Sequence, residues 1–173
     1  MGIITPKKIT ERDEHGEKLT DQWETPLEKV FELVGHFKTV YPLIDAAASA
    51  TNTKCAYFIT RKQDNLIIDW VQYAKTLGVP PYFWHNCPYS NPILGKQVAR
   101  AYEMAKAGCY VLGYYPASTS PEWFHRYIYD ALPPANYLFQ KGRTAFKAPP
   151  GLVDNKRPAG DNLAVYFTPE VCK

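Results

Sequence analysis

The chain has 173 residues, of which 46% are hydrophobic and 21% charged, the proportions of one globular domain rather than of a disordered chain. Its formal net charge of +3 permits a polyanionic partner without requiring one. No apolar run approaches the roughly 20 residues of a membrane span and the N-terminus has no signal-peptide core, so we expect a soluble, intracellular protein (in the host cytoplasm if it is viral) with no membrane partner.

The N-terminal part predicts a charged arm followed by a helix. Residues 1–22 are rich in charge and poor in apolar periodicity. They indicate an arm that is mobile or lies along the surface, ahead of a single domain over residues 23–173. A helix is predicted over residues 25–35, because Thr25 is a suitable N-cap and Pro26 suits the first helical position.

Five short apolar runs predict strands, and helical periodicity fills some of the intervals between them. The strands are expected at residues 40–44, 82–84, 109–115, 136–139 and 163–167. Helices are expected at residues 94–107 and 121–131. This alternation predicts an α/β fold with a mostly parallel sheet and helices on both faces. Ligands of such sheets bind beyond the carboxyl ends of the strands.

Polar or turn-forming segments follow three of the predicted strands. They are Asp45-Ala46-Ala47, residues 86–89 and Pro116-Ala117-Ser118. Since the carboxyl ends of parallel strands share one edge of a sheet, we expect a functional site where these segments meet. A long segment rich in proline and glycine, residues 147–161, carries Lys156 and Arg157 and is interpreted as a substrate-contacting loop or as plain disorder.

The cysteines and histidines give no sign of a metal centre. The four cysteines and four histidines are scattered, without a CxxC pair or a Cys/His ligand spacing. We therefore expect no metal site, no disulfide framework and a reducing compartment. His85 and His125 are interpreted as structural.

Residues 86–89, Asn86-Cys87-Pro88-Tyr89, have the groups needed to methylate an exocyclic amine. The nitrogen of such an amine is a poor nucleophile, because its lone pair is delocalised into the ring. Two acceptors that bind its two hydrogens favour a tetrahedral nitrogen: the side-chain oxygen of Asn86 supplies one, and the main-chain carbonyl of Cys87, restrained by Pro88, supplies the other. Tyr89 can stack on a base that has left the duplex. The alternative interpretation is an ordinary turn at the end of a strand.

These four residues resemble the Asp/Asn-Pro-Pro-Tyr motif of amino-group methyltransferases, with Cys87 in place of the first proline. Several other segments surround the motif in a fixed order. They are Trp23-Glu24-Thr25-Pro26, Ile44-Asp45-Ala46-Ala47-Ala48, Asn52-Thr53-Lys54-Cys55, Asp64-Asn65-Leu66 and Asp69-Trp70 before it, and Tyr115-Pro116-Ala117-Ser118, Trp123-Phe124-His125 and Gly142-Arg143-Thr144-Ala145-Phe146 after it. Their succession, over roughly residues 23–167, is similar to that of the phage-type DNA N6-adenine methyltransferase (Dam-like) family.

The resemblance implies a Rossmann-like enzyme that uses S-adenosylmethionine and methylates adenine N6 in DNA; it leaves the oligomeric state open. The catalytic residues it implies are Asn86, Cys87, Pro88 and Tyr89. The implied cofactor-binding residues are Trp23, Thr25, Pro26, Asp45, Ala46, Asp64, Asp69 and Asn86. The implied substrate-binding residues are Tyr89, Ser118, Arg143, Lys156 and Arg157.

Several of these residues could instead have a structural role. Thr25 and Asp45 could each cap a helix, and Asp69 could cap a helix or pair with a surface lysine. Asp64 is the weaker alternative to Asp69 beside the cofactor adenine. Two other functions also stay open. One is methylation of RNA or of a protein glutamine, because the same chemistry serves any planar amine. The other is a catalytically inactive DNA-binding domain, because Cys87 replaces the first proline of the motif.

Overall fold

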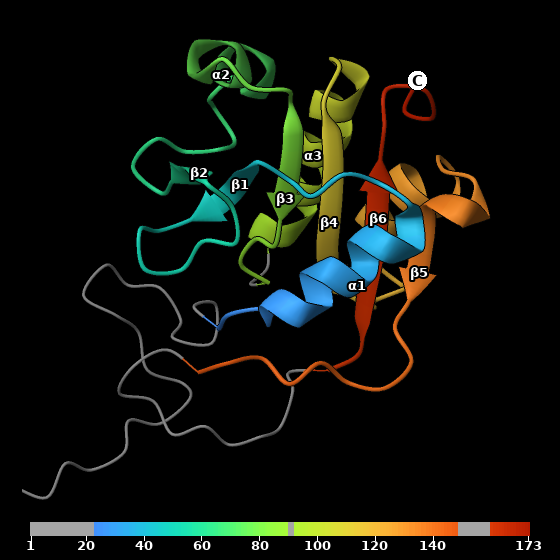
Figure 1. The fold of residues 1–173 in the computed structure, drawn as a ribbon. Helices are drawn as coiled ribbons and strands as arrows, with labels where there is room; N and C mark the ends of the chain where they lie inside the picture. Colours follow the sequence, from blue (N-terminus) through green and yellow to red (C-terminus); the bar gives the residue numbers. More distant parts are fainter. Residues whose placement is uncertain (1–22, 90–91, 149–159) are drawn as a thin grey trace, which may run out of the picture.

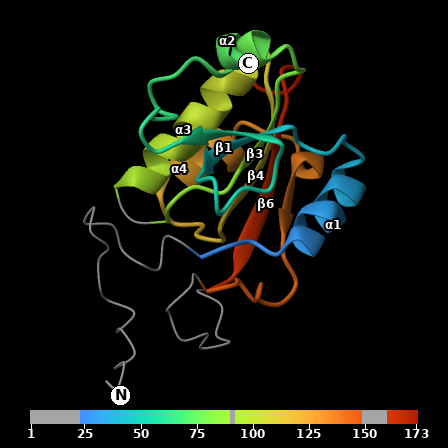
Figure 2. The same ribbon diagram turned by 60° about the vertical axis from the view of Figure 1, so that its left-hand side comes forward.

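The computed structural model describes residues 23–89, 92–148 and 160–173, which form a mixed α/β fold around a six-stranded sheet (Figures 1 and 2). The predicted arm, residues 1–22, lies outside the described residues. The same holds for residues 149–159 of the predicted loop, which include Lys156 and Arg157.

The sheet has a parallel part and an antiparallel part. Its strands are β1 (Ile44–Ala48), β2 (Tyr57–Thr60), β3 (Tyr82–His85), β4 (Tyr110–Pro116), β5 (Tyr137–Phe139) and β6 (Asn162–Phe167). Their order across the sheet is β2-β1-β3-β4-β6-β5. The β1–β2, β1–β3 and β3–β4 pairs are parallel, whereas β6 is antiparallel to both β4 and β5.

Helices cover both faces of this sheet. They are α1 (Leu27–Phe37), α2 (Trp70–Leu77), α3 (Ile93–Lys106) and α4 (Glu122–Phe124), which continues into a π-helical stretch, η2 (His125–Tyr129); a 3-10 turn, η3 (Pro134–Asn136), precedes β5. In Figures 1 and 2, α1 lies on one face of the sheet and α3 on the other. The predicted arrangement of helices on both faces is therefore confirmed.

Alternation along the strands divides the core into two clusters. In β4, Val111 and Tyr115 pack with α3, whereas Leu112 and Tyr114 pack with α1. In β3, Phe83 faces the α3 side. Because both faces are covered, successive residues are all buried, which explains why these strands are continuous apolar runs in the sequence.

The first helix and the first strand differ from their predicted bounds. Helix α1 begins at Leu27, because the backbone of Pro26 (ψ 141°) is not helical, and it continues to Phe37. Thr25 is therefore not the N-cap. Strand β1 begins four residues after the predicted start at residue 40 and contains Asp45 instead of ending before it. Pro42 lacks the N–H that a strand ladder needs, and backbone pairing begins only after it, at Leu43, whose N–H donates to the Tyr82 carbonyl at 3.0 Å.

Candidate functional site

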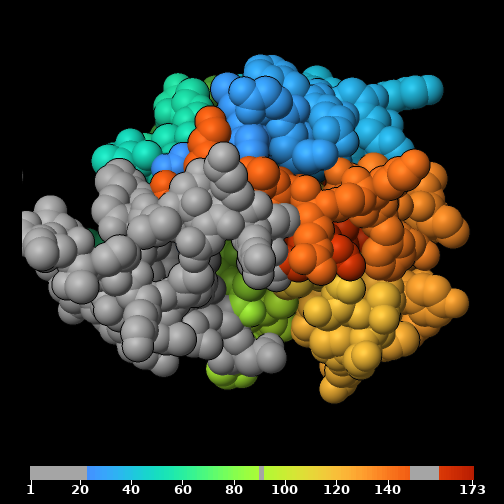
Figure 3. Space-filling model, turned by 90° about the horizontal axis from the view of Figure 1, so that it is seen from below, coloured from blue at the N-terminus to red at the C-terminus, as the bar shows by residue number. Residues whose placement is uncertain are grey.

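The carboxyl ends of the parallel strands β1, β3 and β4 lie at one edge of the sheet, the lower edge in Figure 1. Strand β2 lies on one side of β1 and β3 on the other, so the strand order reverses direction between β1 and β3. Ligands of open α/β sheets bind in the crevice outside such a reversal. Figure 3 looks onto this edge, where the green segment around the end of β3 lies beside the yellow segment around the end of β4.

Asn86, the first residue after β3, has one satisfied and one unsatisfied side-chain group. Its amide nitrogen Nδ2 donates to the hydroxyl of Thr25 at 2.8 Å. Its amide oxygen Oδ1 is buried and has no hydrogen-bond partner among the described residues. A buried acceptor without a donor costs about 1–3 kcal/mol, so such an atom in a native site needs an explanation. The arrangement leaves one strong acceptor available to an incoming N–H group.

Two of the next three residues of the motif, Cys87 and Tyr89, pack against the sheet. The Cys87 side chain is 4% exposed and belongs to the α3-side core. The Tyr89 hydroxyl donates to the main-chain oxygen of Tyr114 at 3.2 Å, and its ring meets that of Phe146 edge to face at 6.4 Å between centroids. Burial raises the pKa of Tyr89 well above its usual value. The phenol is therefore a neutral hydrogen-bond donor with a fixed ring orientation.

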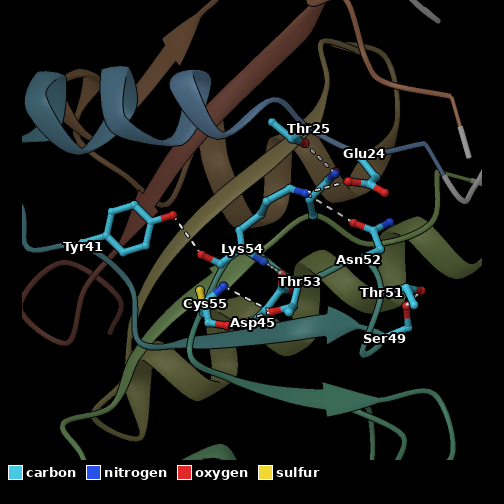
Figure 4. A network of polar contacts seen from close by, with 11 residues as sticks. Glu24, Thr25, Tyr41, Asp45, Ser49, Thr51, Asn52, Thr53, Lys54 and Cys55 are labelled. Carbon is cyan, nitrogen blue, oxygen red and sulfur yellow. Dashed lines mark hydrogen bonds and ion pairs between the residues drawn. The ribbon is translucent and has the colours of Figure 1, made fainter.

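Asp45 is a buried carboxylate on the same face of the sheet as Asn86. It lies opposite Trp84 in the β1–β3 register, and Trp84 packs on the α1 side. Its Oδ1 accepts from the backbone N–H of Ala47 at 3.2 Å, and its Oδ2 accepts from that of Lys54 at 3.0 Å (Figure 4). Burial raises the pKa of Asp45 to about 6, while the two N–H groups and the Lys54 charge act in the opposite direction. At neutral pH the site therefore holds a buried negative charge.

The loop after β1 is fastened to the segment that precedes α1. The Lys54 ammonium lies 3.1 Å from Glu24 Oε2 and 3.5 Å from Asn52 Oδ1, and the Lys54 carbonyl accepts from the Tyr41 hydroxyl at 2.8 Å (Figure 4). Glu24 in turn exchanges two backbone hydrogen bonds of 2.9 Å with Lys147. These contacts bring the segments around Glu24, Lys54 and Lys147 together at the carboxyl edge. The sequence indicated Lys54 only as part of a motif, without its partner.

A comparison with protein families shows the family to which the chain belongs. A family model described as DNA N-6-adenine-methyltransferase (Dam) matches residues 13–165. The chain belongs to this family. Membership confirms the resemblance found in the order of the motifs and implies DNA adenine N6-methyltransferase activity. No curated protein and no solved structure matches the chain.

Two aspartates that were predicted to lie near the cofactor, Asp64 and Asp69, have local structural roles. Asp64 adopts a left-handed backbone (φ 55°), and its Oδ1 accepts from the backbone N–H of Leu66 at 3.0 Å, which stabilises a turn. Asp69 is the N-cap of α2 and accepts from the backbone N–H of Gln72 at 3.0 Å. The cap interpretation of Asp69 is therefore confirmed. A contact of either aspartate with cofactor stays a prediction.

The remaining predicted residues of this Dam-family chain are dispersed around the same edge. Ser118 and Arg143 are exposed, and Arg143 Nε lies 3.5 Å from Asp161 Oδ1. Trp23 packs against the α1-side core. Ala46 is fully buried and belongs to the α3-side core, so its side chain points away from Asp45. Their cofactor and substrate contacts stay predictions.

Residues 23–89, 92–148 and 160–173 contain no group of three or more histidine, cysteine, aspartate or glutamate side chains that could hold a metal ion. Over the same ranges, no helix is both long and apolar enough to cross a membrane.

A buried polar network behind the Dam-like motif was not predicted from the sequence. It joins His85 at the end of β3 to Tyr115 of β4 and to Gln97 of α3, which in turn pairs with Asn65. His85 was expected to be structural, but its partners were not predicted. Gln97 carried a usable signal, since it lies on the apolar face of its helix, three residues after Leu94.

Proposed function

We propose that this chain transfers a methyl group from S-adenosylmethionine to the N6 amine of adenine in DNA, and that its sheet is of the Rossmann-like type. The strand order supports the second part of the proposal. The order of the parallel strands reverses between β1 and β3, and the antiparallel strands β6 and β5 follow β4 at the edge of the sheet. The motif residues lie at that reversal, where such folds bind ligands.

The unpaired Oδ1 of Asn86 is the observation that carries the proposal. Its partner group Nδ2 is bound to Thr25, so rotation of the amide is restrained and Oδ1 keeps its direction. An adenine N6 amine would supply the missing donor and remove the cost of the buried, unsatisfied oxygen. In this position Asn86 Oδ1 takes one amine hydrogen, and the Cys87 main-chain carbonyl, restrained by Pro88, takes the other. Together they favour a tetrahedral nitrogen whose lone pair can attack.

The residues present also fit the proposed cofactor. S-adenosylmethionine supplies an electrophilic methyl group on a sulfonium, and its amino-acid end carries an ammonium group. Asp45 is the buried anion nearest the strand reversal, and a carboxylate that accepts two N–H groups still has lone pairs for a third donor. Asp69, with Asp64 as the alternative, would accept from the cofactor adenine. Trp23 and Pro26 would line the same site, to which Ala46 would present only its main chain.

Tyr89 and several loop residues would bind the DNA. Tyr89 would stack on the flipped base, with its ring orientation set by the hydroxyl contact to Tyr114 and by Phe146. Ser118, Arg143, Lys156 and Arg157 would contact the sugar-phosphate backbone or the bases near the target. No general base is needed before transfer, because the amine attacks as a neutral group and loses its proton afterwards.

The test compares Asn86→Ala with wild-type protein in a transfer assay with radiolabelled methyl donor. We expect label in DNA adenine with wild-type protein and a loss of about 100-fold or more with Asn86→Ala, the magnitude found when one preorganised hydrogen-bond partner is removed from an active site. Cofactor affinity, measured by titration calorimetry, should change little. Asn136→Ala is the matched control, because Asn136, the residue before β5, donates to the Tyr166 carbonyl of β6, away from the motif.

Other outcomes would identify the competing functions. Label that enters only RNA or only protein from the wild-type enzyme would replace DNA as the substrate. Absence of cofactor binding at millimolar concentration would favour an inactive DNA-binding domain. Normal transfer by Asn86→Ala would show that the role assigned to Asn86 is wrong.

A further inference from the structure

His85 lies directly before Asn86 and on the opposite face of β3. Its side chain is 0% exposed, and its ring stands against that of Trp70 at 5.4 Å between centroids. Asn86 contacts Thr25 on the α1 side, whereas His85 contacts Gln97 of α3. The two neighbouring side chains are therefore held from opposite faces of the sheet.

The hydrogen bonds of His85 specify which of its nitrogens carries the proton. Nε2 lies 3.0 Å from Gln97 Oε1, and Nδ1 lies 2.8 Å from the Tyr115 hydroxyl. Gln97 Oε1 also accepts from Asn65 Nδ2 at 2.9 Å, and it has no hydrogen to give. His85 Nε2 must therefore donate. Neutral His85 then accepts at Nδ1, and the Tyr115 hydroxyl is the donor. Burial lowers the pKa of His85 to about 4, against a smaller raising effect of Gln97.

The contact with Tyr115 depends on a glycine in β4. Gly113 lies directly opposite His85 in the parallel register of β3 and β4. A Cβ at Gly113 would lie 2.4 Å from the Tyr115 hydroxyl oxygen, so the Tyr115 ring occupies the space that any other residue would fill. The tyrosine folds back over Gly113 to reach the histidine.

The other end of the network fixes the loop before α2. Gln97 Nε2 donates to Asn65 Oδ1 at 3.0 Å, so the two side chains form a reciprocal pair. The Asn65 carbonyl accepts from Trp70 Nε1 at 2.8 Å. Arg100, one turn further along α3, donates to the Ile68 carbonyl at 2.6 Å. This loop carries Asp64 and Asp69 at its two ends.

We propose that neutral His85 is a positioning residue that aligns Asn86 for methyl transfer by fixing the end of β3 to β4 and to the loop of residues 64–69. This inference rests on the proposed function, because the aligned group is the acceptor for the target amine. His85 itself touches neither substrate nor cofactor. Its network joins the two segments that would hold the reacting amine and the cofactor adenine, so a shift of one is transmitted to the other.

Three variants of His85 and Tyr115 separate alignment from simple packing. His85→Phe keeps a planar ring but removes both polar contacts. His85→Asn places an acceptor where Nδ1 stands and restores only the Tyr115 contact, and Tyr115→Phe removes only the donor to Nδ1. We expect His85→Phe to lower kcat by about 100-fold, the scale of a 1 Å misplacement, with KM for DNA and cofactor affinity changed by less than about 3-fold. His85→Asn and Tyr115→Phe should retain an intermediate kcat.

Nuclear magnetic resonance supplies readouts that do not depend on activity. In wild-type protein at neutral pH, the two-bond proton–nitrogen spectrum should show His85 as the Nε2–H tautomer. The side-chain amide pair of Asn86 should shift in His85→Phe and less in His85→Asn. If His85→Phe does not fold, Tyr115→Phe carries the same test of the Asn86 signals and of kcat.

The possible failures are distinguishable. Wild-type protein that transfers no methyl group to DNA refutes the proposed function, and the positioning role for that reaction with it. Wild-type transfer together with a His85→Phe variant that keeps its kcat and its Asn86 signals refutes the positioning role alone. A resting Nδ1–H tautomer or imidazolium would overturn the hydrogen-bond assignment on which the role depends.

Discussion

Replacement of Gly113 by alanine tests whether the β3–β4 register and the Tyr115 position are as described. The added Cβ would lie 2.4 Å from the Tyr115 hydroxyl oxygen and 2.5 Å from its Cε2, distances that real Cβ atoms do not show. Tyr115 is fully buried. Its ring therefore cannot swing into solvent and must displace other core residues.

The expected cost has two parts and one small offset. Forcing an extra methyl group into a packed core costs about 1–3 kcal/mol. Losing the bond from Tyr115 leaves His85 Nδ1 buried without a donor, which costs about 1–3 kcal/mol more. Replacing glycine with alanine where the backbone permits it returns about 0.4–1 kcal/mol by restricting the unfolded chain. We expect Gly113→Ala to lower the free energy of unfolding by about 3 kcal/mol, a large fraction of the roughly 5–15 kcal/mol of a typical domain.

Urea denaturation at neutral pH measures this change, with two controls. Gly35→Ala lies within α1 with no atom within 4 Å of the new Cβ, so it should stabilise the protein by about 0.5–1 kcal/mol. In a Tyr115→Leu background the obstructing ring is gone, so Gly113→Ala should cost less than about 1 kcal/mol. A Gly113→Ala protein as stable as wild type, or an equal cost in both backgrounds, would refute the packing described here.

Three further predictions concern other contacts of the site. The pKa of His85 is lowered from 6.5 to about 4, so its contribution to stability is complete above pH 6.5 and is lost as the pH falls towards 4. The pKa of Asp45 is raised from 3.8 to about 6, so its contribution to stability is lost as the pH rises through 6. Asp45→Asn removes the opposing dependence of Asp45, so the unfolding free energy of this variant should fall by about 3 kcal/mol between pH 6.5 and 4. Wild type should show a flatter profile, and a flat profile in the variant would contradict the prediction. Asp69→Ala should destabilise α2 by about 1 kcal/mol in urea denaturation, whereas Asp69→Asn keeps the N-cap hydrogen bond. A loss of cofactor affinity in Asp69→Asn would therefore indicate a contact between Asp69 and the cofactor. Thr25→Val leaves Asn86 Nδ2 without a partner and should reduce methyl transfer by about 10-fold, whereas Thr25→Ser should retain it; equal activity of the two variants would contradict the role of the hydroxyl.

The elements with strong periodicity were predicted closely from the sequence. Helix α3 begins and ends within one residue of its predicted bounds, because apolar residues recur on one face of a helix that Gly108 terminates with a φ of 116°. Strand β4 is displaced by one residue at each end. In these segments the local pattern and the tertiary packing favour the same structure.

Other elements depend on contacts that a local pattern does not contain. Strand β2 and helix α2 were not predicted. Helix α2 has only eight residues, and its start is fixed by the Asp69 cap and by the burial of Trp70 beneath β3. Strand β1 was misplaced because its second residue is a carboxylate. Asp45 is tolerated there since two backbone N–H groups compensate its burial, that of Ala47 within β1 and that of Lys54 in the following loop.

The candidate site was predicted in its composition but not in its connections. The sequence placed Asp45 and Asn86 at strand ends and grouped Thr25 with them, and the structure brings Thr25 into contact with Asn86. The hydrogen bond between Thr25 and the Asn86 amide could not be predicted from the sequence, because it joins residues 61 positions apart. The pairing of Lys54 with Glu24 likewise depends on the register of β1 and on the path of the segment before α1.

The end of β3 shows why those connections matter for the chemistry. Strand geometry sends successive side chains to opposite faces, so His85 and Asn86 are held by different layers of the protein. Among the described residues, the Asn86 side chain is hydrogen-bonded to Thr25 alone, and its oxygen must stay unpaired to bind an amine. A tether to its oxygen would remove that acceptor, so rigidity beyond what Nδ2 can provide comes through the backbone from the neighbouring residue. His85, with both ring nitrogens bonded, supplies it. The unsatisfied acceptor on one face and the satisfied network on the other are thus two parts of one arrangement, which is why a change at His85 should lower kcat without removing a single contact to substrate.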